Sequence, residues 1–363
     1  MTTTPRIDGF RMPAEWERHA GCAMIWPERP DNWRDGARPA QAAFAAVAAA
    51  IARYETVTMI VSERLMDAAR AALPHEVRLL AIETDDSWAR DVGPVFVADA
   101  NRRVRAVDFP FNAWGGHEHG LYAPWDKDDA LARQLCEALD VRRYRAPCVL
   151  EGGAIHADGE GTALVTEPCL LDPARNPAVT KAAMERWLGD YLGVQAVIWL
   201  GPGIPEDETG GHIDNLACFA APGRVLLAWC DDPDDPHYTV SRAAAARLDA
   251  ATDARGRRLT IEKLPMPSKM VITQEESAGV VSTGKGMNRA EGARLAASYV
   301  NFYIANGAVI APGFGTETDD AARAVLARNF PGRDIVMLPA REILLGGGNI
   351  HCITCQIPEG NPG

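Results

Sequence analysis

Gly346-Gly347-Gly348-Asn349-Ile350-His351-Cys352 is the stretch that decides the fold, because a glycine run there delivers a cysteine near the end of the chain. Glycines let a backbone take positive φ or approach another backbone closely. The same phrase occurs at 152–156, directly after Glu151, and at 210–214. The copies align as Gly-Gly-x-Ile-[His/Asp], which indicates a repeated unit with one glycine turn in each copy.

The repeated turns carry reactive side chains, namely Glu151, His212, Asp214 and Cys352. A carboxylate, an imidazole, a second carboxylate and a thiol are the parts of a cysteine-based catalytic site. One double glycine alone would indicate only the end of a strand. Three copies that carry four chemically matched residues predict an active site.

Size and composition indicate a globular protein with a large core. The chain has 363 residues, of which 47% are apolar and 24% charged. No stretch approaches the roughly 18 consecutive apolar residues that a membrane span needs. Residues 1–11 contain no apolar signal-peptide core, so we expect a cytoplasmic protein with no membrane partner. The 8 cysteines are then expected to be reduced thiols.

The charge of the chain favours one class of ligand and disfavours another. The formal net charge is -12. Nucleic acid prefers a basic surface, so we expect no nucleic-acid partner. A small cationic substrate fits this charge. A homo-oligomer is left open.

Secondary-structure patterns repeat along the chain. Apolar spacing predicts helices over 39–54, 64–73, 128–139, 177–191, 240–248 and 319–329. Strands are predicted over 56–61, 77–82, 95–97, 103–109, 196–200, 259–264, 335–338 and 352–357. Hairpins are predicted to join 154–157 with 163–166, 216–219 with 225–229, and 298–304 with 308–311. The aromatic and proline residues around 12–27 favour packed irregular structure.

The polar turns at Asp91, Glu151 and His212 lie about 60 residues apart. A supersecondary period of this length indicates units arranged around an axis. Matching turns would then converge on one central site. No linker-like composition divides the chain, so we predict one domain over residues 1–363.

Two aspartates define the chemistry that the site could perform. If Asp91 and Asp214 face one pocket, each raises the pKa of the other unless a cation lies between them. A guanidinium is planar and permanently charged, and it suits such a pair. Its electron-poor carbon could be attacked by a thiolate. For Asp91, a salt bridge with Arg90 or a turn cap is the open alternative.

The sequence closely resembles the agmatine deiminases of the guanidino-group-modifying (pentein) superfamily over most of its length. The resemblance rests on the segments 12–16, 85–91, 111–116, 150–153, 210–214, 298–303, 340–343 and 352–354. It implies an α/β fold, a five-bladed pseudo-symmetric propeller of ββαβ-type units with the active site on the central axis.

The resemblance also implies the reaction, the hydrolysis of agmatine to N-carbamoylputrescine and ammonia in polyamine biosynthesis. Cys352 would attack the guanidinium carbon to form an S-alkylthiouronium intermediate, and Asp91 and Asp214 would hold the guanidinium nitrogens. His212 would act as general acid and then general base, oriented by Glu151. No metal or organic cofactor is implied.

Several residues leave alternatives open. Trp88 and Trp114 are predicted to pack along the aliphatic part of the substrate or to be simply buried. Cys352 and Cys355 form a C-x-x-C, which permits a thiol oxidoreductase. His117 and His119 could be metal ligands or a solvated loop, and we expect no metal. His156 and His351 are predicted to be hydrogen-bonded structural residues.

Other functions compete with the hydrolysis of agmatine. A deiminase of free or peptidyl arginine would use the same chemistry but would need a cationic group for the substrate carboxylate. A non-catalytic propeller would leave the matched glutamate, histidine, aspartate and cysteine unexplained. If Cys352 begins an extended strand, Cys355 should point to the opposite face. An imidazolium at His212 is expected to favour the thiolate of Cys352.

Overall fold

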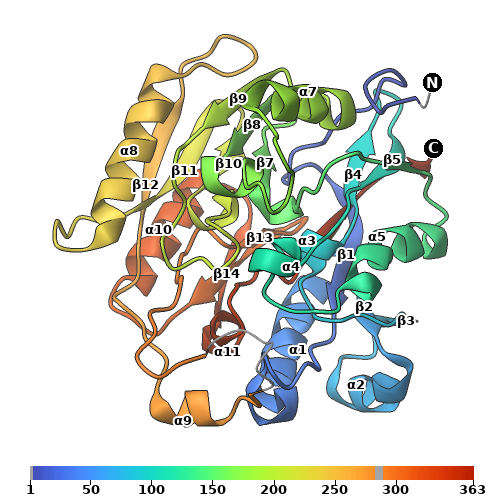
Figure 1. Ribbon diagram of the computed structural model, residues 1–363, viewed down its shortest axis with the longest axis vertical. Helices are drawn as coiled ribbons and strands as arrows, with labels where there is room; N and C mark the ends of the chain where they lie inside the picture. The colour runs from blue at the N-terminus through green and yellow to red at the C-terminus, as the bar shows by residue number, and fades with distance from the viewer. Residues whose placement is uncertain (1–2, 283–288) are drawn as a thin grey trace.

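The computed structural model describes residues 3–282 and 289–363. These residues form five separate small sheets. Figure 1 shows the sheets grouped around the middle of the molecule, with the longer helices on the outside. The predicted α/β fold is therefore confirmed, and five sheets around one centre agree with the predicted five-bladed propeller. Within the described residues, no helix is both long and apolar enough to cross a membrane.

Four of the sheets contain three strands that follow one another in the chain. They comprise β4 (Val95–Ala98), β5 (Arg103–Asp108) and β6 (Arg143–Arg145); β7 (Ile155–Ala157), β8 (Thr162–Val165) and β9 (Ala196–Trp199); β10 (Ala217–Ala221), β11 (Arg224–Trp229) and β12 (Thr260–Pro265); and β13 (Tyr303–Ile304), β14 (Ala308–Gly313) and β15 (Asp334–Pro339). In each, the first two strands are antiparallel and the second and third are parallel.

Parallel neighbours need a crossover connection, and a long helix supplies it in each sheet. These helices are α1 (Arg38–Ala52), α5 (Asp126–Ala138), α7 (Lys181–Leu192), α8 (Pro236–Ala250) and α10 (Asp319–Asn329). Shorter helices are α2 (Met66–Ala72), α3 (Ala89–Val92), α4 (Gly116–His119), α6 (Glu167–Leu170), α9 (Gln274–Ala278) and α11 (Arg341–Leu345). In α1, Phe44, Val47 and Ile51 are buried.

The fifth sheet joins the two ends of the chain. The strand β16 (Cys355–Pro358) pairs antiparallel with β1 (His19–Ile25), which is followed by β2 (Thr56–Val61) and β3 (Arg78–Ala81). Ala23 lies opposite Cys355 in this pairing. The last strand, β17 (Asn361–Pro362), lies against β5. The ring of sheets is therefore closed by strands from opposite ends of the sequence.

Most predicted elements match the structure, and the exceptions have physical causes. The region 12–27 contains a strand, β1, instead of only irregular structure. Its residues 22–25 are fully buried, so no alternation of apolar and polar residues marks it. The helix α7 begins at Lys181, not 177, because Ala178 has φ 57 and Thr180 caps the helix. Cys352 lies in a turn, and the strand begins only at Cys355.

Candidate active site

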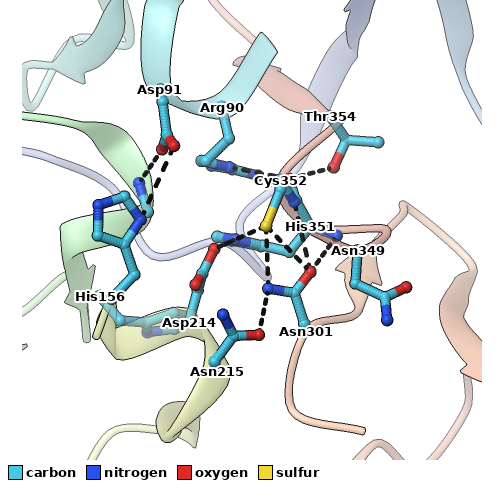
Figure 2. A network of polar contacts seen from close by, with 12 residues as sticks. Arg90, Asp91, His156, Asp214, Asn215, Asn301, Asn349, His351, Cys352 and Thr354 are labelled. Atoms are coloured by element: carbon cyan, nitrogen blue, oxygen red, sulfur yellow. Dashed lines mark hydrogen bonds and ion pairs between the residues drawn. The ribbon is translucent and has the colours of Figure 1, made fainter. Parts of the chain in front are cut away.

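Five short turns, one before the antiparallel edge strand of each sheet, converge at the centre of the ring. Asp91 lies on α3 before β4, and Glu151 precedes the 3-10 turn Gly152–Ala154 before β7. His212 and Asp214 lie at the 3-10 turn Ile213–Asn215 before β10. Asn301 precedes β13, and Cys352 precedes β16. We call these segments the site turns, and Figure 2 shows several of their side chains facing one another.

The site turns border a cavity whose empty space is about 330 Å³, including solvent at its mouth. Its lining includes the predicted residues Asp91, His212, Cys352, Trp88 and Trp114, together with Leu121, Asp207, Glu208, Thr209, Asn215 and Gly346 to Gly348. Glu151 and Asp214 are buried and lie behind this lining. The structure therefore brings together all seven residues that the sequence predicted for catalysis and substrate binding.

His212 lies between two carboxylates. Its Nδ1 is 3.8 Å from Oδ2 of Asp91, and its Nε2 is 3.7 Å from Oε2 of Glu151. Burial of the imidazole opposes its charge, but Asp91 and Glu151 outweigh burial and raise the pKa of His212 to about 9. His212 is therefore an imidazolium at neutral pH.

The carboxylates around His212 differ in their own protonation. Burial raises the pKa of Asp91 to about 6, although His212 opposes this shift. Burial would raise the pKa of Glu151, but the larger combined effect of Arg175 and His212 lowers it to about 2. Arg175 does so from 2.8 Å, through Nε donating to Oε1 of Glu151. Arg175 is a residue that the sequence analysis did not identify.

Cys352 is held by polar side chains and not by His212. Its Sγ accepts a hydrogen bond from Nδ2 of Asn301 at 3.1 Å and lies 3.5 Å from Oδ2 of Asp214 (Figure 2). Burial, followed by the charges of Asp214 and Asp91, raises the pKa of Cys352 well above its usual value. Burial and the two aspartates therefore oppose the thiolate that His212 is expected to favour.

Asn301 is the second residue that the sequence analysis missed. Besides its contact with Cys352, its Oδ1 accepts from the backbone of His351 at 2.9 Å, and its Nδ2 donates to Oδ1 of Asn215 at 3.0 Å. It is fully buried. Its turn lacks the Gly-Gly-x-Ile phrase. The sequence analysis placed it inside the predicted hairpin strand 298–304, whereas the observed strand β13 begins only at Tyr303.

Asp91 is oriented by neutral donors. Its Oδ1 accepts from the backbone N–H of Gly153 at 2.9 Å, and its Oδ2 accepts from Nε1 of Trp114 at 3.0 Å. The alternative of a salt bridge to Arg90 is wrong, because Arg90 pairs with Glu15 at 3.4 Å. Trp88 is held differently, since its Nε1 donates to Asp86 at 3.0 Å. Both tryptophans are buried and still present surface to the cavity.

The glycine of one site turn is required by its surroundings. A Cβ on Gly153 would lie 2.6 Å from Nδ1 of His212, 2.8 Å from Oδ1 of Asp91 and 2.9 Å from Oδ2 of Asp214. Real Cβ atoms do not make such short contacts. The repeated glycine therefore allows three functional side chains to meet at one backbone position.

The remaining candidates lie outside the cavity lining. Cys355 points toward the backbone oxygen of Pro94, with Sγ at 3.6 Å, and all eight cysteines are free thiols. His117 packs on Trp125 with ring centroids 4.7 Å apart. Among the described residues, no three His, Cys, Asp or Glu side chains are arranged to hold a metal ion.

Comparisons with known proteins agree with this geometry. Residues 11–358 match the family described as Porphyromonas-type peptidyl-arginine deiminase. The chain is 55% identical over 359 residues to an agmatine deiminase of Pseudomonas aeruginosa strain LESB58, with 98% of each chain covered. It is 52% identical over 360 residues to an agmatine deiminase of Ectopseudomonas mendocina strain ymp, covering 99% of this chain and 98% of that one. A solved structure of agmatine deiminase from Enterococcus faecalis matches with a TM-score of 0.96 and 45% identity, covering 99% of this chain and 98% of that one.

Proposed function

The chain belongs to the agmatine deiminases within the Porphyromonas-type peptidyl-arginine deiminase family, and from this premise we propose that it hydrolyses agmatine to N-carbamoylputrescine and ammonia. The observation that carries the proposal is a buried cavity in which a cysteine faces several carboxylates. Such a cavity favours a cation with an electrophilic carbon, and a guanidinium is both.

The guanidinium would be held between the two predicted aspartates. Oδ1 of Asp214 is buried and has no hydrogen-bond partner among the described residues. Each oxygen of Asp91 accepts one hydrogen bond and can accept another. A bound cation would favour ionised Asp91, whose pKa burial raises to about 6. It would also lower the pKa of Cys352 and so generate the thiolate when substrate arrives.

The reaction then proceeds in two halves. The thiolate of Cys352 forms a bond to the guanidinium carbon, and His212 gives its proton to the departing nitrogen, which leaves as ammonia. The remaining adduct is an S-alkylthiouronium. Neutral His212 next takes a proton from water, the oxygen bonds to the same carbon, and the carbon–sulfur bond breaks. Glu151 stabilises the charged form of His212 in both halves.

The mouth of the cavity fits the amine of agmatine better than the carboxylate of arginine. Oε1 of half-buried Glu208 pairs with Nη1 of Arg289, and its Oε2 has no hydrogen-bond partner among the described residues. None of the described residues that line the cavity is Lys or Arg. We assign Glu208 to the terminal ammonium, and Trp88 and Trp114 to the aliphatic chain between the two charged ends.

Ammonia release with agmatine, arginine and an arginine peptide tests this assignment. We expect turnover with agmatine and little with the other two. Glu208→Gln should lower kcat/KM for agmatine about 10- to 100-fold, because a charge-assisted hydrogen bond contributes about 1.5–3 kcal/mol. Glu206→Gln is the matched control, since Glu206 pairs with His237 and Arg294 outside the cavity lining. Preference for arginine or its peptide would contradict the proposal.

The other expectations remain proposals. The partners are the cationic guanidino substrate and water, in the cytoplasm, with a homo-oligomer left open. A redox function through Cys352 and Cys355 would require both thiols for activity. In that case Cys355→Ser would be as inactive as Cys352→Ser.

A further inference from the structure

His351 precedes the nucleophile in sequence, but its ring lies between two buried carboxylates. Nδ1 is 2.9 Å from Oδ2 of Asp214. Nε2 is 2.9 Å from Oε1 and 3.2 Å from Oε2 of Glu15. All three residues are at most 3% exposed. The result is a buried chain, Glu15–His351–Asp214, that ends at the sulfur of Cys352.

The two contacts of the His351 ring, with Glu15 and with Asp214, decide its protonation. A neutral imidazole has one N–H and one lone pair. Either neutral tautomer would turn a lone pair toward a carboxylate oxygen at 2.9 Å. Although burial opposes their ionisation, contacts with neighbouring groups lower the pKa of both Glu15 and Asp214. Beside ionised carboxylates, both contacts are attractive only when both ring nitrogens carry protons. Burial and then Arg90 oppose the charge, but Glu15 and Asp214 raise the pKa of His351 above its usual value.

Around Glu15, His351 and Asp214, each negative charge has a positive charge close to it. Glu15 also faces Arg90 at 3.4 Å and His156 at 3.6 Å. Asp214 also faces Cys352 and, at longer range, His212. An imidazolium at His351 therefore compensates Asp214, as Arg90 compensates Glu15. Without it, a thiolate at Cys352 would form 3.5 Å from a carboxylate that only the substrate and the more distant His212 compensate.

We propose that His351, oriented by Glu15, is a positioning residue that acts on Asp214 as an imidazolium. Its ring binds Oδ2 of Asp214 and leaves Oδ1 of Asp214 for the guanidinium. It also keeps Asp214 ionised and reduces the repulsion between Asp214 and the thiolate. This inference rests on the proposed function, because it assumes that Asp214 holds the substrate.

His156 provides a matched control for His351. It is equally buried and faces the same glutamate, with Nε2 3.6 Å from Oε2 of Glu15. Its Nδ1, however, accepts a hydrogen bond from the backbone N–H of Phe219 at 3.2 Å. A neutral tautomer satisfies both contacts, and His156 does not contact Asp214 through any described hydrogen bond. Replacing His156 therefore tests packing beside Glu15 without removing the positive charge of His351 beside Asp214.

The first test compares His351→Gln with His156→Gln. We expect His351→Gln to lower kcat for agmatine about 10- to 100-fold. Without the imidazolium, the pKa of Asp214 rises. The acid limb of kcat/KM should then move to higher pH and become steeper, because both Asp91 and Asp214 titrate there. His156→Gln should leave the limb in place. A His351→Gln variant with unchanged kcat would overturn the inference. So would a variant with lowered kcat whose acid limb has not moved.

The second test does not depend on turnover. Nitrogen NMR of wild-type protein with labelled histidine reports whether each ring carries one proton or two. We expect the ring of His351 to carry two protons above pH about 6.5, the ordinary histidine pKa, as the ring of His212 does. A variant that lacks the histidine assigns the signal. A neutral His351 refutes the inference even if agmatine is the substrate, whereas an imidazolium with an inactive wild type refutes only the proposed function.

Discussion

Asp91 and His212 set the pH range in which the free site can work. Asp91 must be ionised to hold a guanidinium, so activity is lost as pH falls through its pKa of about 6. His212 must be protonated to release ammonia, so activity is lost as pH rises through its pKa of about 9. A plot of kcat/KM against pH should therefore be bell-shaped, with limbs near these values.

Glu151 offers a way to move both limbs in a known direction. Its negative charge raises the pKa of His212 and of Asp91. Glu151→Gln should therefore shift the alkaline limb and the acid limb to lower pH, and lower kcat without abolishing binding. Kinetics across the pH range measure this. An unchanged profile in a folded variant would contradict the pairing of Glu151 with His212.

At the scale of single elements, the site turn before β13 has a distinct task. Asn301 fixes the sulfur and the backbone of the nucleophile turn. Asn301→Ala should lower kcat about 10- to 100-fold, because removing a buried hydrogen-bonding partner costs about 1–3 kcal/mol. The expected loss is accompanied by slower alkylation of Cys352.

Asn306, in the hairpin loop of the same sheet, is the control for Asn301. Its side chain bonds the backbone N–H and C=O of His19, each at 2.9 Å, and joins β1 to this hairpin. Asn306→Ala should lower the free energy of unfolding by about 1–3 kcal/mol and leave kcat unchanged. If Asn301→Ala lost only stability, as Asn306→Ala does, its role at the sulfur would be wrong.

Some elements and site residues could be predicted from sequence patterns, whereas others, such as Asn301, could not. Helices and strands with a clear period, such as α10 and β2, were predicted at their observed bounds. The strand β1 was missed because it is buried on both faces. The glycine phrase located Glu151, His212, Asp214 and Cys352. Asn301, Arg175 and Glu15 carry no such mark, because their roles come from contacts that only the closed ring creates.

At the scale of the whole molecule, the last strand completes the ring. Gly21 and Ala23 of β1 lie opposite Ile357 and Cys355 of β16. Without β16, β1 would be an edge strand, and the turn that carries Cys352 would lose its anchor. Because every sheet contributes one site turn, we infer that residues 1–363 form one domain and that the site exists only in the closed ring.

Truncation tests this inference. A chain that ends at Thr354 retains every proposed site residue but should lose activity and its cooperative unfolding transition. A chain that ends at Pro358 lacks only β17 and should stay active and unfold in one transition. Denaturation followed by circular dichroism and by fluorescence, together with ammonia release, measures both. Full activity in the shorter chain would contradict a single closed domain.

The central claim is that Cys352 becomes covalently bonded to the guanidinium carbon of agmatine during turnover. The most direct measurement is mass spectrometry of enzyme quenched with acid while it turns over agmatine. The tryptic peptide after Arg341 contains both Cys352 and Cys355, since no Lys or Arg follows. Fragmentation must therefore locate the modification, and Cys355→Ser serves as the control. We predict an S-alkylthiouronium adduct on Cys352 in both proteins. An unmodified Cys352, or a Cys352–Cys355 disulfide in place of the adduct, would contradict the account.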